Sequence, residues 1–150
     1  MKKITALLVL LFSSSISALP DCPSNPNEYF NNCYGTWTAS DGYKYEGEWV
    51  DNQQHGEGTA YYPNGTTFVG EFVYGKRTKG TYSFVDGDSY TGEFKDSAMH
   101  GYGEYTFNGG RVLKGYFYED KFIPDICTDM GLAEQTESFG DCVVELIKRL

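Results

Sequence analysis

The sequence lacks an apolar run long enough to cross a bilayer. The run from Ile4 to Phe12 is well short of the roughly 20 residues that a membrane-spanning helix needs. It follows the basic start Met1–Lys3 and precedes the small-residue stretch Ser13–Ala18, an order typical of a secretory signal peptide. We therefore expect residues 1–18 to be a signal peptide and the mature protein to be exported, either periplasmic or secreted.

Positive charge is scarce. The chain has 12 Lys and Arg against 21 Asp and Glu, and its formal charge of −9 becomes −11 if Lys2 and Lys3 leave with the signal peptide. Such a surface is repelled by the phosphates of nucleic acids and by anionic lipid headgroups. We therefore expect no nucleic-acid partner and no direct binding to anionic membranes. The cluster Lys76, Arg77 and Lys79 is the one place where this expectation could fail.

Signatures of catalysis and of cofactor binding are also missing. There is no nucleophile elbow and no phosphate-binding loop. His55 and His100 stand two repeats apart, about 20 Å at two strands per repeat, which is too far to share a metal. Asp86 and Asp88 offer two carboxylates, far short of the roughly six oxygens that Ca²⁺ requires. We expect no enzymatic activity, no cofactor and no metal.

Cysteines are few but even in number. None of the four has the Cys-x-x-Cys spacing typical of zinc sites, and an exported chain favours disulfides. Three connectivities are possible, and proximity in sequence predicts Cys22–Cys33 and Cys127–Cys142. A lipoprotein modified on Cys22 is a weaker alternative, because Asp21 stands where lipidation requires a small residue.

Glycine and aromatic residues are abundant, and they recur with a period of 22 or 23 residues. Such a period is typical of a repeat architecture. Each copy opens with Gly and reaches a Gly-ending turn pair seven residues later, in residues 35–42, 58–65, 80–87 and 103–110. Each copy continues with a five-residue segment that has a central glycine between large apolar residues, at residues 45–49, 68–72, 90–94 and 113–117.

Within each copy the apolar residues alternate with polar ones, which predicts β-strands with one apolar face. The Asp-Gly and Asn-Gly pairs between alternating runs predict a hairpin turn in each copy. The polar stretch between copies, such as Val50–His55, is expected to be a longer loop. The fold predicted is all-β, an elongated open antiparallel sheet of about four β-hairpin repeats.

Equivalent positions of the four copies hold aromatic residues with a glycine between them. The residues that we expect to define the repeat are Gly47, Gly70, Gly92, Gly115, Trp49, Phe72, Phe94 and Phe117. There are four such rows, which begin at Trp37, Ala39, Tyr45 and Trp49, and all four contain only apolar or aromatic residues. This favours a buried core for all four rows over a sugar-binding platform. A glycine at the centre lets neighbouring rings lie down across the sheet, so Gly70→Val is expected to overpack two rings.

The segment Tyr45–Gly58 and the equivalent segment Tyr90–Gly103 closely resemble the MORN (membrane occupation and recognition nexus) repeat. The resemblance covers about residues 33–122. The copy at 68 departs from the pattern because it is one residue short and has Thr78 in place of a glycine. The last copy lacks the leading aromatic residue and the late glycine pair. The resemblance implies an elongated sheet of hairpins used for binding or scaffolding, often beside membranes, without catalysis.

Two segments flank the predicted sheet at residues 34–122. Residues 19–33 are expected to form an irregular N-terminal cap, and residues 123–150 a disulfide-tied C-terminal helix. Apolar residues at helical spacing from Phe139 to Leu150 predict a short amphipathic helix. We expect it to cap the last hairpin, because the open end of a repeat array needs covering. A membrane-surface helix is the alternative.

The sequence therefore predicts a non-catalytic MORN-repeat binding or scaffold protein of the bacterial cell envelope, whose partner is an unidentified protein or other envelope component. The alternative is a carbohydrate-binding or hydrolytic envelope protein that uses the aromatic rows together with Glu48, Glu71 and Glu93. These carboxylates are expected about 10 Å apart, on the face opposite the rings. The solvent exposure of the rings distinguishes these alternatives. Buried rings support the binding or scaffold protein, whereas an aromatic strip open to solvent supports the carbohydrate-binding or hydrolytic protein.

Overall fold

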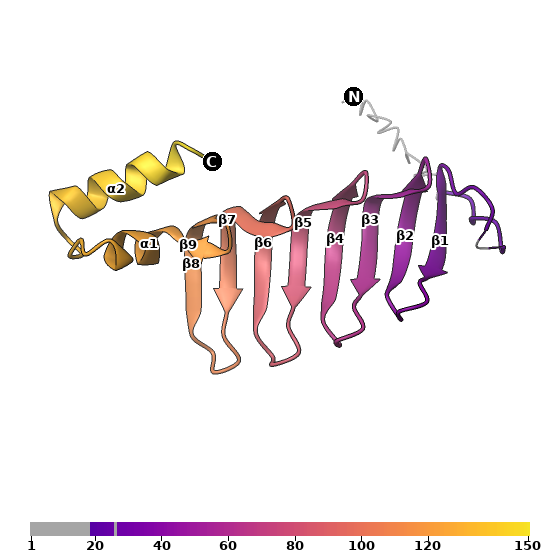
Figure 1. Cartoon of the computed structure of the whole chain (residues 1–150), viewed down its shortest axis with the longest axis horizontal. Helices are drawn as coiled ribbons and strands as arrows, with labels where there is room; N and C mark the ends of the chain where they lie inside the picture. Colours follow the sequence, from indigo (N-terminus) through magenta and orange to yellow (C-terminus); the bar gives the residue numbers. More distant parts are fainter. Residues whose placement is uncertain (1–18, 26) are drawn as a thin grey trace, which may run out of the picture.

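The computed structural model of the chain describes residues 19–25 and 27–150, and the predicted signal peptide lies outside these residues. Nine strands form one antiparallel sheet in which each strand pairs with its neighbours in sequence order, and two helices follow (Figure 1). The strands are β1 (Cys33–Thr38), β2 (Lys44–Val50), β3 (Gln53–Tyr61), β4 (Thr67–Val73), β5 (Lys76–Ser83), β6 (Ser89–Lys95), β7 (Ala98–Thr106), β8 (Val112–Tyr118) and β9 (Lys121–Phe122). The helices are α1 (Ile123–Asp129) and α2 (Glu137–Ile147). The predicted open sheet of hairpins is confirmed. No helix in the described part of the chain is long and apolar enough to cross a bilayer.

The loops that join the two strands of each repeat lie along one edge of the sheet, at the bottom of Figure 1. All have five residues, at 39–43, 62–66, 84–88 and 107–111. In each loop the first N–H donates to the carbonyl of the fifth residue, over 2.8–2.9 Å. The fourth residue is always glycine, with φ between 84° and 94°, a region that side chains rarely tolerate. The predicted hairpins are therefore present where the Gly-ending pairs placed them.

The connections between repeats are tight two-residue turns, and the prediction of a longer loop at Val50–His55 was wrong. The four turns are Asp51–Asn52, Tyr74–Gly75, Asp96–Ser97 and Glu119–Asp120. Both residues of every turn have positive φ, between 46° and 79°, the geometry of the turn that matches the twist of an antiparallel pair. Because β3 starts directly after its turn, His55 lies within a strand, and so does His100 in β7.

Bulges interrupt the pairing next to these turns. Between β2 and β3 the register passes from Gly47↔Gly58 to Glu48↔His55, so two residues of β3 have no partner in β2. The pair β6–β7 repeats this two-residue bulge. Between β4 and β5 only Thr78 is skipped, which accounts for the copy that is one residue shorter. A bulge adds local twist and re-aims the side chains beside it.

One glycine from each of the first eight strands lies in a continuous row across the sheet. The row is Gly35, Gly47, Gly58, Gly70, Gly80, Gly92, Gly103 and Gly115, with each paired to the next in register. The ring of Tyr45 lies over Gly47 and Gly58, and the ring of Tyr90 over Gly92 and Gly103. The missing side chains thus give these rings room to lie on the sheet.

Gly70 differs from the other glycines of its slot. A Cβ there would meet the backbone of β5, 2.5 Å from Gly80 Cα and close to the Lys79 carbonyl, and no ring is among its nearest neighbours. Gly70 has φ +156°, a value that it shares with Gly115. The expectation that a side chain at this position would overpack two rings is therefore corrected. The constraint on Gly70 comes from the close approach of two strands.

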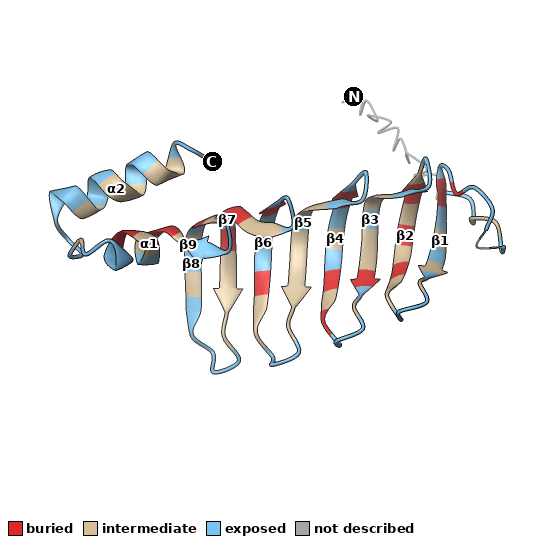
Figure 2. Ribbon diagram, viewed as in Figure 1, coloured by how far each residue is buried: buried red, intermediate tan, exposed pale blue. Residues whose placement is uncertain are grey.

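The buried core is a chain of aromatic rings on one face of this single-layer sheet. We call this face the ring face and the opposite face the back face. Figure 2 marks in red where the buried residues lie along the ribbon. Nine rings follow one another with centroids 5.0–5.3 Å apart, in the order Phe30, Trp49, Tyr45, Phe72, Phe68, Phe94, Tyr90, Phe117 and Phe122. All but the last pair meet edge to face, with interplanar angles of 77–90°, an arrangement that aromatic rings prefer. Each repeat therefore buries its rings against the next.

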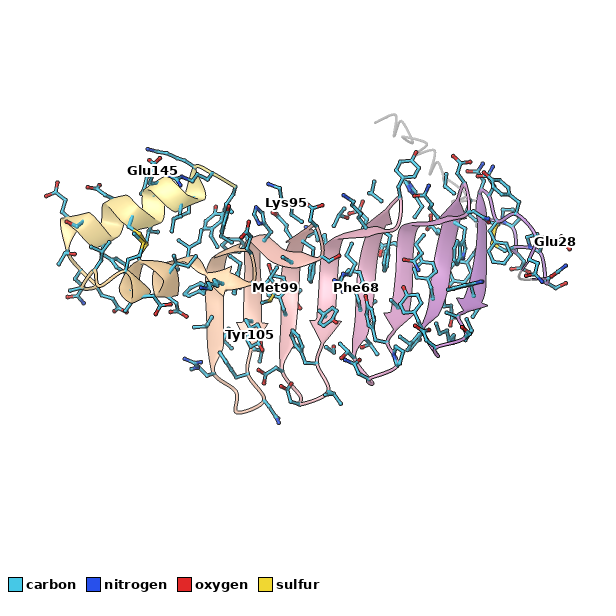
Figure 3. All side chains as sticks on the ribbon, in the orientation of Figure 1. Glu28, Phe68, Lys95, Met99, Tyr105 and Glu145 are labelled. Atoms are coloured by element: carbon cyan, nitrogen blue, oxygen red, sulfur yellow. A yellow bond between two sulfur atoms is a disulfide. The ribbon has the colours of Figure 1, made fainter. Side chains whose placement is uncertain are left out.

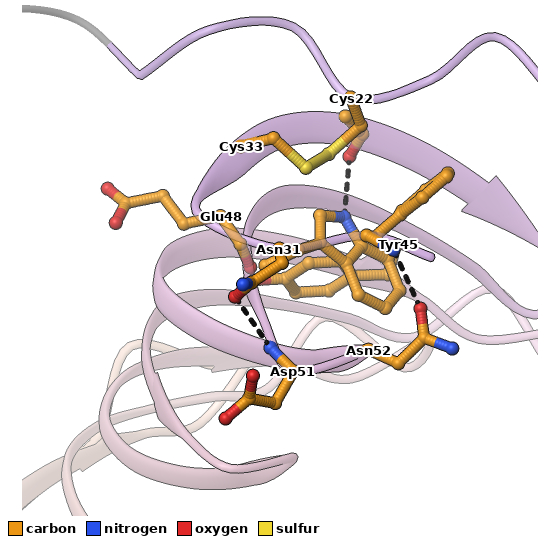
Figure 4. The surroundings of a disulfide bond; sticks show 10 residues. Cys22, Asn31, Cys33, Tyr45, Glu48, Asp51 and Asn52 are labelled. Atoms are coloured by element: carbon orange, nitrogen blue, oxygen red, sulfur yellow. Dashed lines mark hydrogen bonds between the residues drawn. A yellow bond between two sulfur atoms is a disulfide. The ribbon is translucent and has the colours of Figure 1, made fainter. Parts of the chain in front are cut away.

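The N-terminal segment covers the β1 end of the ring chain (Figure 4). A disulfide joins Cys22 to Cys33, the pair predicted, and Cys22 covers Gly35 at the end of the glycine row. Phe30 packs on Trp49, and its backbone exchanges hydrogen bonds of 2.8 Å with the side chain and the N–H of Asn52. The cap is thus attached to the first tight turn as well as to β1.

The C-terminal end holds two helices where the sequence predicted one. The apparent break at Ile123–Pro124 is the start of α1, because proline suits the first turn of a helix. Ile123 and Cys127 of α1 are fully buried, so α1 is the helix that covers the last strands. The predicted amphipathic helix, α2, has Thr136 as its N-cap, packs on α1 and has no buried residue. A second disulfide, Cys127–Cys142, links the two helices.

Candidate functional site

A strip of partly exposed rings runs beside the buried ring chain, toward the five-residue loops. It consists of Tyr43, Tyr62, Tyr82, Phe84, Tyr105 and Phe107. Neighbouring centroids along the strip are 4.8–5.9 Å apart, with interplanar angles of 41–62°. The strip comes from the ends of the odd strands and the loops that follow them, where the sheet has no second layer to cover its side chains. The ring face is therefore buried along its centre and accessible to solvent along this side.

A second row of side chains lies on the ring face near the tight turns. Its members stand two residues after the end of a turn. Gln54, Arg77 and Met99 occupy it in β3, β5 and β7. Gln54 Nε2 donates to the hydroxyl of Tyr43 over 2.8 Å, and Arg77 donates to the hydroxyl of Tyr62 over 2.9 Å. These contacts bridge from the turn side of the ring face to the aromatic strip. The row went unrecognised in the sequence because the tight turns that define it were interpreted as a loop.

Arg77 lies over the middle of the ring face. Its guanidinium carbon is 4.9–5.8 Å from the centroids of four rings, those of Tyr62, Phe68, Tyr82 and Phe94. It also donates to the carbonyl oxygen of Ser97 over 3.0 Å. Burial raises the pKa of the Tyr62 phenol, while Arg77 acts to lower it. Arg77 thus places a positive charge among apolar rings, where the ring faces attract it.

Two adjoining hollows lie between the strip and the turn row, toward the C-terminal end. The first, of about 390 Å³, is lined by Arg77, Tyr82, Phe84, Phe94, Ser97, Met99, Tyr105 and Asp120. The second, of about 380 Å³, continues past Met99 and Tyr105 to α1, with Phe107, Leu113, Phe117, Phe122 and Ile126 among its walls. We call the two together the groove. Met99 and Tyr105, labelled in Figure 3, stand at the boundary of its two halves.

The two ends of the groove differ in charge. Arg77 lines one end, Asp125 and Asp129 line the other together with Lys121, and Asp120 lines both hollows. Asp120 accepts a 2.8 Å hydrogen bond from the N–H of Met99. The groove is therefore apolar along its length, cationic toward β5 and anionic toward α1.

The predicted glutamate row lies away from the groove. Glu71 and Glu93 are exposed on the back face, where each is in register with Lys79. Glu48 shares that face. Because the rings occupy the ring face, no ligand in the groove can reach these carboxylates. The hydrolytic alternative, which requires the aromatic and glutamate rows to act together, has no shared site in this arrangement.

The other predicted candidates also lie apart from the groove or from one another. The rings of His55 and His100 contact those of Tyr74 and Tyr118, and the two histidines lie beside the two-residue bulges of β3 and β7. Asp88 accepts hydrogen bonds from the Tyr105 hydroxyl and from a backbone N–H of the next loop. In the described part of the chain, no three His, Cys, Asp or Glu side chains gather as metal ligands would.

The basic cluster at 76–79 is divided by the bulge in β5. Arg77 covers rings on the ring face. Lys76 forms an ion pair with Asp96 (2.9 Å), and Lys79 lies on the back face between Glu71 and Glu93. The three cations therefore form no common patch.

Comparison with protein families identifies the repeats. Residues 45–67, 68–89 and 90–110 match the model of the MORN repeat. No curated protein matches the chain. The chain thus carries MORN repeats at residues 45–110, and such repeats are generally non-catalytic binding modules.

Proposed function

We propose that this chain, whose residues 45–110 are MORN repeats, is a non-catalytic binding or scaffold protein of the bacterial cell envelope that holds a segment of a partner protein in its groove. The observation that carries this proposal is the groove itself, a hollow whose lining is mostly aromatic and aliphatic, with charged side chains around it. Concave, mostly apolar surfaces of this kind are where proteins take up ligands.

Rigidity supports the same function. The floor of the groove includes Phe94 and Phe117, which are held in the chain of edge-to-face rings. Side chains that are already fixed lose little conformational entropy when a partner binds, which favours affinity. A preformed groove on a stiff sheet therefore suits a scaffold better than a site that must assemble.

The envelope location is inferred from two independent features. The two disulfides indicate an oxidising compartment. The basic, apolar and small-residue segments at 1–18 have the order of a secretory signal peptide. Together they favour a periplasmic or secreted protein.

Carbohydrate binding is the second candidate, because the strip is partly open to solvent and carries tyrosine hydroxyls. Its rings, however, are tilted by 41–62° from one another, so they do not form one flat platform. Titration of tryptophan fluorescence with envelope oligosaccharides tests this candidate. Saturable binding of a sugar, lost in Phe84→Ala/Phe107→Ala, would favour it over protein binding.

The experiment for protein binding is a pull-down from envelope extracts with the mature protein in three forms. Phe84→Ala/Phe107→Ala removes two rings of the groove and strip. Val69→Ala/Val112→Ala removes two exposed apolar side chains from the back face and is the matched control. We expect the groove variant alone to lose its partner, with melting curves showing that both variants fold. A partner retained by the groove variant, or lost equally from both, would contradict the proposal.

A further inference from the structure

We propose that the α1 end of the groove is a subsite for the lysine or arginine side chains of a basic, amphipathic segment of the partner protein. This inference rests on the proposed function and specifies the chemistry of the partner. It concerns the half of the groove that lies beyond Met99 and is bounded by α1.

The floor and walls of this half are apolar. Phe117 is buried at its base, and Leu113, Phe122 and Ile126 are partly exposed around it. Tyr105 and Phe107 close the side toward the loops. The hollow of about 380 Å³ is large enough to take several apolar side chains, and ring faces are also favourable neighbours for a cation.

The rim of this half is anionic. Asp120, Asp125 and Asp129 line it, and none of the three is ion-paired with another residue in the described part of the chain. Lys121 is the one cation among the described lining residues. Long basic side chains pack their aliphatic stems on apolar surface while their charged heads reach a polar rim. An apolar floor with carboxylates at its rim is complementary to a side chain that has an aliphatic stem and a cationic head.

The carboxylates on α1 are held in place by the fold. Asp125 and Asp129 stand one turn apart on a helix that is anchored by buried Ile123 and by the disulfide at Cys127. Both therefore face the hollow together from a fixed helix. Because their positions do not depend on flexible loops, a partner meets a preformed charge pattern.

Arg77 at the other end gives the groove a direction. A basic segment that placed its charges over β5 would meet the guanidinium, which already donates to Tyr62 and Ser97. Like charges brought together in this way suppress the wrong orientation. The basic residues of the partner are thus expected at α1, with its apolar residues extending toward Met99 and Arg77.

The test uses the full chain and a labelled synthetic peptide that carries leucine and lysine at helical spacing. Two further peptides serve as probes, one with glutamate and one with glutamine in place of every lysine. Binding is followed by fluorescence anisotropy and by the methyl resonance of Met99, with the methyl resonances of the exposed Val69 on the back face as internal reference. We expect the lysine peptide to shift Met99 but not Val69, to bind more weakly as salt is raised, and to bind more tightly than the other two.

Two charge variants separate a site from a general effect of net charge. Asp125→Asn/Asp129→Asn removes two negative charges from the rim, and we expect about a fivefold loss of affinity for the lysine peptide. Glu57→Gln/Glu71→Gln removes the same charge from exposed positions of the back face and should change the affinity little.

The outcomes distinguish a failure of the basic subsite from a failure of the proposed function. Equal affinity for the lysine and glutamine peptides, or equal losses in the two charge variants, would overturn the basic subsite and leave groove binding intact. Failure of every peptide to shift Met99 would also overturn the subsite. The proposed function itself fails if the groove variant of the pull-down keeps its partner, or if both variants lose it equally.

Discussion

The hydroxyl of Tyr45 donates to the carbonyl oxygen of Glu48, 3.1 Å away beside the bulge between β2 and β3, with the carbonyl oxygen of His55 at 3.3 Å. Tyr90 makes the same contacts with Glu93 and His100 beside the bulge between β6 and β7. Next to the one-residue bulge between β4 and β5, Phe68 stands at the equivalent position. There the Thr78 hydroxyl donates to the equivalent carbonyl, that of Glu71, over 3.3 Å. Beside each of the three bulges, a hydroxyl group thus donates a hydrogen bond to a backbone carbonyl oxygen.

Tyr90→Phe is expected to lower the free energy of unfolding by about 1 kcal/mol at neutral pH, because the variant loses a buried hydrogen bond. The effect should reverse in alkali. Burial, reinforced by Glu93, raises the pKa of Tyr90 to about 12 from its ordinary value of 10.0. The unfolded chain therefore loses this proton first, and stability falls as the pH rises from about 10 to 12. Denaturant unfolding should show a shallower alkaline loss for Tyr90→Phe than for wild type. Equal slopes would contradict this assignment.

Gly58→Ala should displace the ring of Tyr45. The added Cβ would lie 2.5 Å from Cζ of that ring and 2.6 Å from Cε2, a separation that packed carbons do not tolerate. We expect a loss of about 1–3 kcal/mol of stability, as for other overpacked cores. Gly109→Ala is the matched control, because nothing lies within 4 Å of its added Cβ. Chemical denaturation of both variants measures the difference, and equal stabilities would show that the ring is free to move.

Gly70→Val should be more damaging than Gly58→Ala, at least about 3 kcal/mol, because the clash is with backbone. Its Cβ would approach Gly80 Cα of the neighbouring strand at 2.5 Å, and φ at this position is +156°. A side chain can rotate away, whereas a paired strand can yield only by losing its hydrogen bonds. Thermal melts of the two variants test whether Gly70→Val loses more stability than Gly58→Ala. An unchanged melting temperature would mean that β4 and β5 do not approach each other so closely.

The disulfide pairs can be checked chemically. Peptide mapping without reduction should recover Cys22 linked to Cys33 and Cys127 linked to Cys142, because these are the pairs that the fold brings together. The first pair lies at the β1 end of the sheet and the second between the two helices. A dominant peptide linking Cys22 to Cys142, or Cys33 to Cys127, would be incompatible with this fold.

Anionic vesicles should bind the protein weakly and no better than neutral vesicles. Basic residues contribute to such docking about 1 kcal/mol each only when they face the surface together. Lys76 is ion-paired with Asp96, Arg77 lies over rings and Lys79 is on the back face. Vesicle sedimentation at low salt is the measurement. Salt-sensitive binding to anionic vesicles, lost in Lys76→Ala/Arg77→Ala/Lys79→Ala, would show membrane recognition instead.

Much of the architecture follows from local pattern. The glycine period and the alternation of apolar residues predicted four hairpins, and the Asp-Gly and Asn-Gly pairs located their loops. Of the four rows expected to be buried, those that begin at Tyr45 and Trp49 are buried except at Leu113. The prediction was wrong for the rows that begin at Trp37 and Ala39, which are half-buried except at Ala60 and supply most of the open strip. The features predicted correctly are local because each repeat packs only on its neighbours, so one repeat already contains most of the information about the next.

The groove was much less predictable. Arg77, Met99 and Phe122 follow tight turns whose residues, such as Asp51 and Asn52, are also common in loops. The start of α1 was hidden by a proline, which ends a helix as often as it begins one. Charge and hydropathy alone therefore could not show that these side chains share one surface.

The sequence by itself determined the repeat, its strands and the slots that hold rings and glycines, because these depend on spacing within about two dozen residues. The tertiary structure alone decided which rings stay open to solvent and which charges meet at the ends of the groove. Those outcomes depend on the register between strands, which the bulges beside Gly47, Glu71 and Gly92 shift. A shift of one residue moves a side chain to the other face of a sheet, so Arg77 reaches the rings while Lys79 reaches the back face.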